Sequence, residues 1–120
     1  MNDIIKQALA EDTLVDITAT GRKTGAPRKF EIMLRRHAGK YYIAGRPEPK
    51  GWYANMVAQP EITLHLKQSV QADLPATAHP VLDEAERRQL FQLFFGDSAL
   101  MTDLEEWVQH AKLVELSVQL

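Results

Sequence analysis

Apolar residues alternate with polar ones, or form short continuous runs, in several segments rich in β-branched and aromatic side chains. Alternation with a period of two is typical of strands that bury one face. Because Pro75 lacks a backbone donor, the strand that contains it is expected at a sheet edge or with a bulge. The predicted strands cover residues 14–18, 30–34, 41–44, 61–66, 69–78 and 113–118.

Other segments repeat their apolar positions with helical spacing. Residues 4–9 predict a short amphipathic helix behind a polar cap at the start of the chain. Asp83 with Glu86 three residues later resembles a capping box, and a glycine follows the apolar run after it. The further predicted helices cover residues 52–58, 83–95 and 98–107.

The order of these elements predicts the fold class. Strands come first and most helices come late, without regular alternation, which argues against a doubly wound parallel sheet. We expect a mainly β, α+β protein: an antiparallel barrel or sheet of about six strands with peripheral helices. The 120 residues fit a single domain over residues 1–120, without an internal repeat or a linker.

Charge and residue content exclude several classes of function. Lys and Arg total 14 against 16 Asp and Glu, a net charge of -2, which is not typical of a nucleic-acid binder. The chain has no cysteine and its 4 histidines lie far apart, so no metal site is expected. Hydrolase and NTPase motifs are absent. Without a signal-peptide pattern or a membrane-span run, we expect a cytoplasmic protein with no stable membrane insertion.

A turn between the first two predicted strands carries the clearest chemical signal. Arg22, Lys23 and Arg28 place three cations on a turn flanked by glycines. Such a turn presents positive side chains and free backbone N–H groups in one small concavity, which suits a phosphate or a carboxylate. The alternative is a solvated hairpin loop whose charge serves solubility.

A second candidate region follows a loop over residues 45–51, which contains two prolines and two glycines. The helix after this loop begins with glycine, so its first N–H groups are available to an anion. Trp52 and Tyr53 offer flat surfaces for a ring system, close to Arg46 and Lys50. Core packing alone is the alternative explanation for Trp52.

Four separated motifs stand in a distinctive order: TGRKTG at residues 20–25, PR at 27–28, WYAN at 52–55 and QPEITL at 59–64. In this order they resemble the deazaflavin-dependent nitroreductase family, whose pattern is T-G-R-K-S/T-G-x-P-R, one hairpin, W-Y-x-N, then N-P-x-V-x-V. The resemblance covers roughly residues 15–78. It implies a split β-barrel that binds coenzyme F420, a deazaflavin, or a flavin.

The resemblance also implies which residues contact the cofactor. The cations of the first motif would neutralise the phosphate and the acidic tail of F420, and the second motif would wall its ring. The implied contacts are Arg22, Lys23, Thr24, Pro27, Arg28, Ala44, Gly45, Trp52, Tyr53 and Asn55.

Three departures from the family pattern bear on activity. Glu31 stands where family members often carry a proline, and a carboxylate there would repel an anionic cofactor unless it points away. The loop over residues 45–51 is short and lacks the usual glycine-rich, lysine-bearing segment, so the phosphate clamp is expected to differ. Some family enzymes use a tyrosine in the C-terminal helical region, but residues 94–107 contain none. Tyr53 is then the nearest candidate for a catalytic proton donor, and slow or restricted turnover is expected.

The resemblance therefore implies an F420-dependent oxidoreductase that transfers a hydride between the reduced cofactor and a small acceptor, such as a quinone, an enone or a nitro compound. Two alternatives stay open: an FMN-binding reductase on the same fold, and a non-enzymatic split-barrel binding protein. The expected partner is a small-molecule substrate, and the expected assembly is a monomer or a homodimer.

Overall fold

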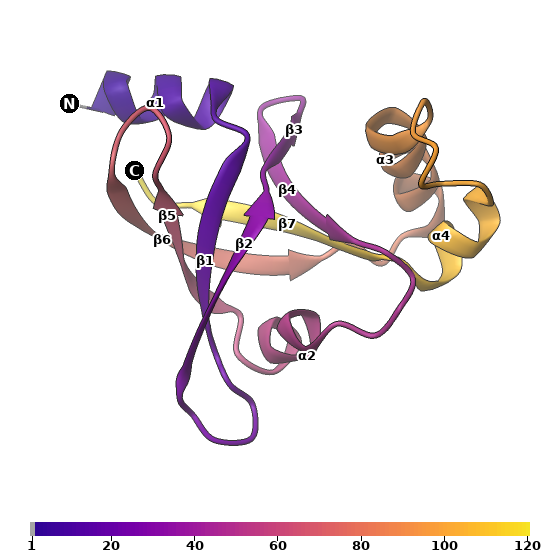
Figure 1. Ribbon diagram of the computed structural model, residues 1–120, viewed down its shortest axis with the longest axis horizontal. Helices are drawn as coiled ribbons and strands as arrows, with labels where there is room; N and C mark the ends of the chain where they lie inside the picture. Colours follow the sequence, from indigo (N-terminus) through magenta and orange to yellow (C-terminus); the bar gives the residue numbers. More distant parts are fainter. Residues whose placement is uncertain (1) are drawn as a thin grey trace.

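The structure is a computed structural model that describes residues 2–120. Within them the chain forms seven strands and four helices (Figure 1). The sequence prediction of about six strands missed the short β3, because three residues are too few to show alternation. In chain order the elements are α1 (Asn2–Glu11), β1 (Leu14–Thr20), β2 (Pro27–Met33), β3 (Arg35–His37), β4 (Lys40–Gly45), α2 (Gly51–Ala58), β5 (Glu61–Leu66), β6 (Ala72–Pro80), α3 (Glu84–Phe95), α4 (Leu104–His110) and β7 (Lys112–Val118).

The strands form one antiparallel sheet in the order β2-β1-β5-β6-β7-β4-β3. The two edge strands, β2 and β3, are consecutive in the chain and only the buried Leu34 separates them. The backbone N–H of Leu34 donates to the Thr13 carbonyl at 2.7 Å. Because the chain passes directly from one edge to the other, the sheet curls on itself (Figure 1). The predicted fold class, a mainly β split barrel with peripheral helices, is confirmed.

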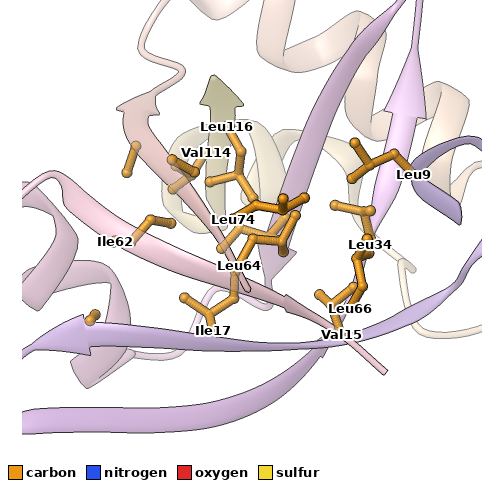
Figure 2. Close-up of a cluster of buried hydrophobic side chains, with 14 of the residues drawn as sticks. Leu9, Val15, Ile17, Leu34, Ile62, Leu64, Leu66, Leu74, Val114 and Leu116 are labelled. Carbon is orange, nitrogen blue, oxygen red and sulfur yellow. The ribbon is translucent and has the colours of Figure 1, made fainter. Parts of the chain in front are cut away.

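The inside of the curled sheet holds the main hydrophobic core. Burial alternates along β1, so Val15 and Ile17 point inward while Asp16 between them faces the other side. They pack in one cluster with Leu64 of β5, Leu116 of β7 and Leu9 of α1 (Figure 2). Each of these five side chains is almost fully removed from water, which stabilises the fold by roughly 1.5–3 kcal/mol per side chain.

A second apolar cluster lies under α3 and α4, which stand apart from α1 and α2 in Figure 1. It joins Phe91 of α3 and Trp107 of α4 to Tyr42 of β4 and Leu113 of β7. Phe91 and Trp107 meet edge to face, with ring centroids 5.8 Å apart. This cluster fixes the two late helices against the sheet.

The helix caps explain where α3 and α4 begin. The Asp83 side chain accepts a hydrogen bond from the Glu86 N–H at 2.9 Å, so the predicted cap of α3 is confirmed. The prediction of a helix over residues 98–107 placed its start too early, because Asp103 caps α4 by accepting from the Glu106 N–H at 3.3 Å. Among the described helices, none is both long and apolar enough to cross a membrane.

The expectation for Pro75 is wrong: β6 lies in the interior of the sheet, between β5 and β7. Pro75 pairs with Thr63 of β5, and its carbonyl accepts from the Gln119 N–H at 2.9 Å. Its nitrogen therefore faces the β7 side, just past Val118, where β7 has ended. The missing N–H therefore affects only the terminal bond of the β6–β7 ladder, next to Gln119.

Candidate functional site

The turn between β1 and β2 is held by its own backbone. The Gly21 N–H donates to the Ala26 carbonyl and the Gly25 N–H to the Gly21 carbonyl, both at 2.8 Å. Gly25 has φ 73°, a left-handed conformation that favours glycine. The Ala26 N–H donates to the Thr24 hydroxyl at 3.2 Å. The expectation of free N–H groups is therefore wrong for Gly21, Gly25 and Ala26, which use theirs to shape the turn.

Asn55 of α2 anchors this turn to the rest of the protein. Its side-chain Oδ1 accepts from the Arg22 backbone N–H at 3.0 Å and from Arg22 Nη1 at 2.9 Å. Asn55 is buried, and its side-chain oxygen is committed to Arg22. This oxygen therefore positions the turn.

The remaining cations of the turn are open to solvent. Lys23 and Arg28 are exposed, and in the part of the chain that the structure describes neither forms an ion pair with a carboxylate. The Arg28 side chain lies over the turn, since its Nε is 3.4 Å from the place that a Cβ on Gly21 would take. Thr24 and Pro27 are exposed beside them. The turn thus offers two uncompensated cations to an anion.

Trp52 forms the wall of a pocket one helical turn from Asn55. Residues three apart lie on the same face of a helix and about 4.5 Å apart along its axis. Trp52 stacks on Phe30 of β2, with ring centroids 5.5 Å apart and planes 18° apart. Its Cζ2 lies 2.9 Å from where a Cβ on Gly45 would stand. Any side chain at Gly45 would therefore displace the indole.

The pocket beside this indole, which we call the Trp52 pocket, has a volume of about 260 Å³. It opens between the ends of β2 and β4, the loop before α2, and the α3–α4 region. Ala44 and Gly45, both predicted from the sequence, lie in it with Trp52. The other lining residues are Ile32, Met33, Arg35, Arg46, Lys50, Phe95, Leu100 and Trp107.

Glu31 points away from this pocket. Its carboxylate is ion-paired with Lys67, which also bonds Asp16 at 2.8 Å. Because successive residues of a strand face opposite sides, Glu31 stands on the face opposite to Phe30 and Ile32. The Lys67 ammonium lowers the pKa of the Asp16 carboxyl. The departure from the family pattern therefore puts no negative charge into the Trp52 pocket.

Tyr53 was predicted as a site residue from the sequence, but it lies outside the pocket that Trp52, Ala44 and Gly45 line. Its ring touches the Trp52 ring edge to face, with centroids 6.2 Å apart. It does not line the Trp52 pocket, and instead lines a second pocket of about 310 Å³ with Arg87, Lys112 and residues of α4. Lys112 Nζ lies 5.5 Å from the centre of the Tyr53 ring.

Sequence reasoning missed the wall that α3, α4 and β3 supply. Arg35, Phe95, Leu100 and Trp107 reach the pocket only because α3 and α4 fold back onto β3 and β4. The one available signal was the family resemblance, which drew attention to the C-terminal helical region that contains Trp107. Within residues 2–120, no group of three or more His, Asp or Glu side chains is arranged to hold a metal ion.

Solved structures of known proteins share this fold. A reductase described as F420-H2 dependent is 25% identical, with 90% of this chain and 95% of that chain covered and a TM-score of 0.62. A domain-swapped dimer is 21% identical, with coverage of 91% and 81% and a TM-score of 0.63. A putative pyridoxamine 5'-phosphate oxidase from Listeria innocua is 11% identical, with coverage of 98% and 93% and a TM-score of 0.74.

The family comparison bears on the class of enzyme. The model of the F420H(2)-dependent quinone reductase family matches residues 4–115, which include the cationic turn, the WYAN motif and the α3–α4 region. The predicted class, an F420-dependent oxidoreductase, is confirmed at the level of the family. The chain belongs to the F420H(2)-dependent quinone reductase family.

Proposed function

We propose that this protein binds coenzyme F420 with its ring in the Trp52 pocket and its anionic tail at the cations of the β1–β2 turn. The observation that carries the proposal is the pair of contacts made by one face of α2. Asn55 holds Arg22 of the turn at 2.9 Å, and Trp52 walls the pocket against Gly45. One short helix thereby links an anion site to a ring site at a fixed separation.

The residues present fit such a cofactor. Lys23 and Arg28 supply charge without a competing carboxylate, and Glu31 faces the other side of the sheet. Gly45 lets the Trp52 indole lie directly against the backbone, and both Gly45 and Ala44 line the pocket in which a planar ring would stack. Bound in its reduced form, F420 supplies the hydride, and the protein orients it and excludes water.

The acceptor is a small molecule such as a quinone, an enone or a nitro compound. A quinone that takes up one hydride and one proton becomes a hydroquinone, so a proton must reach the acceptor as well. Phe95, Leu100 and Trp107 form the α3–α4 wall of the pocket and carry no side-chain group that titrates near neutral pH. This wall therefore packs against an acceptor, and we infer that the proton comes from solvent.

Titration with F420 and FMN tests the cofactor assignment. We expect F420 to quench the fluorescence of Trp52 and to bind more tightly than FMN, because the turn and the WYAN motif match the deazaflavin family. A Trp52→Phe variant should lose most of the quenching while the fluorescence of F420 itself still reports binding. Tight binding of FMN without binding of F420 would instead favour the flavin reductase, and binding of neither would remove the proposal.

The position of Tyr53 predicts that it is dispensable for proton transfer. We expect Tyr53→Phe to turn over quinone and nitro acceptors at a rate within about threefold of wild type, whereas loss of a general acid typically costs 10²–10⁴-fold. Steady-state kinetics with reduced F420 under saturating cofactor measure this. A drop of about a hundredfold in kcat, with F420 affinity unchanged, would identify Tyr53 as the proton donor after all.

A further inference from the structure

Arg35 of β3 is a partly buried cation on the wall of the Trp52 pocket. Its guanidinium carbon lies 4.1 Å from the centre of the Phe95 ring and 5.8 Å from that of Phe94. Its one hydrogen bond runs from Nη1 to the Phe94 carbonyl and is long, at 3.4 Å. Burial lowers the pKa of the Arg35 guanidinium from its ordinary value. Burial therefore makes this charge costly, and the Phe95 ring offsets part of that cost.

The buried Arg87 and the partly buried Arg36 are much better satisfied. Arg87 donates to four backbone carbonyls, and Arg36 donates to those of Leu9 and Asp12. Within residues 2–120, Arg35 forms no ion pair with a carboxylate. Four of its five guanidinium N–H donors thus have no protein partner in the described chain.

The charged side chains that line the Trp52 pocket are cations, as far as the structure describes the chain. No Asp or Glu is among the described residues that line it, whereas Arg46 and Lys50 add two further cations from the loop before α2. A half-desolvated guanidinium gains most from a charged hydrogen-bonding partner, since such bonds are about twice as strong as neutral ones. The planar fork of arginine also matches the two oxygens of a carboxylate.

We propose that the acceptor reduced by this protein is a small planar molecule that bears an anionic group, and that Arg35 is the residue that selects it. This inference rests on the proposed function, which places the cofactor ring along Ala44, Gly45 and Trp52. The acceptor then lies on the α3–α4 side, against Phe95 and Trp107, which contact each other, with its anionic group at Arg35. The tail of the cofactor is bound at Lys23 and Arg28, on the turn, and leaves Arg35 to the acceptor.

The test compares two nitroaromatic probes that differ in charge: 4-nitrobenzoate and neutral 4-nitrobenzyl alcohol. Quenching of Trp107, which lines the pocket, reports their binding to the protein loaded with oxidised F420, in which the cofactor already quenches Trp52. We expect the carboxylate to bind at least about tenfold more tightly than the alcohol. With reduced F420, kcat/KM should show the same preference.

Variants then assign the preference to Arg35. Arg35→Met should abolish it, with the Kd of the alcohol within about threefold of wild type, whereas Arg35→Lys should keep part of it because the charge remains. Arg88→Met is the matched control, since it removes the same charge from an arginine of α3 that lies outside the pocket and pairs with Glu105. It should leave the preference unchanged.

Three results would overturn the inference. The first is equal binding of the two probes by wild type, and the second is a preference that persists in Arg35→Met. The third is a loss of F420 affinity in Arg35→Met as large as its loss of affinity for 4-nitrobenzoate. That third result would assign Arg35 to the cofactor. If Arg35→Met does not fold, Arg35→Lys takes its place, and an unchanged preference in that variant would overturn the role of Arg35. If F420 itself fails to bind, the proposed function fails, but the probe titration of the unloaded protein still measures whether the pocket prefers an anion.

Discussion

Lys23→Glu and Arg28→Glu are each expected to weaken the binding of F420 by at least about tenfold while the domain stays folded. Both side chains are exposed on the β1–β2 turn, without a carboxylate partner in the described chain. A charge-assisted hydrogen bond contributes roughly 1.5–3 kcal/mol, and a glutamate adds repulsion. Fluorescence titration with F420 and thermal melts of the same samples measure affinity and folding separately.

Lys6→Glu is the matched control for these reversals. It makes the same change of charge on α1, at the end of the molecule opposite to the turn in Figure 1. It should leave the affinity unchanged, because exposed charges separated by more than about 10 Å are largely screened at 0.1 M salt. Arg22 is less suitable for this test, since its guanidinium also anchors the turn to Asn55. Unchanged affinity in both turn variants would show that the turn is a solvated hairpin loop.

Arg87→Met is expected to produce the largest loss of stability. Arg87 is buried and donates to the carbonyls of Val81, Trp107, Val108 and Ala111, so it closes the C-terminal end of α4 and ties it to α3. Methionine keeps much of the apolar stem but removes every donor, which leaves buried carbonyls unpaired. We expect a loss of about 2–4 kcal/mol, which corresponds to a fall in Tm of roughly 8–15 °C for a domain of this size.

The neighbouring Arg88→Met is the matched control. Arg88 is paired with Glu105 at 2.6 Å, but both side chains are substantially exposed. An exposed pair contributes about 0–1 kcal/mol, so this variant should melt within a few degrees of wild type. Thermal unfolding of the two variants under identical conditions makes the comparison. Equal melting temperatures would show that water replaces the Arg87 donors without cost.

Most of the fold was predictable because its signals are local. The alternation of β1 and β5 and the Asp83 cap each depend on residues close together in the chain. Pro75 misled the prediction because a missing N–H excludes an interior strand position only under one condition. The nitrogen must lie where that N–H would bond a paired residue of the neighbouring strand. Whether it does so depends on where β7 ends, which is a property of the pairing and not of the segment.

The candidate site also has parts that the sequence predicts and parts that only the structure shows. The cationic turn and the WYAN motif were visible because their residues are contiguous, and Ala44 and Gly45 followed from the family pattern. The burial of Asn55 against Arg22 and the separation of Tyr53 from the Trp52 pocket were not visible, since each depends on how α2 is rotated against β1 and β2.

The sequence by itself determined the antiparallel split barrel, the cationic turn, the ring-binding motif and the family, because short-range patterns and ordered motifs carry that information. Only the tertiary structure decided which side chains share a pocket. Arg35 meets Phe95 across 60 positions of the chain, and Arg87 meets the end of α4 instead of solvent. Such contacts arise when separate elements pack together, and packing depends on the shape of both partners, which no local pattern records.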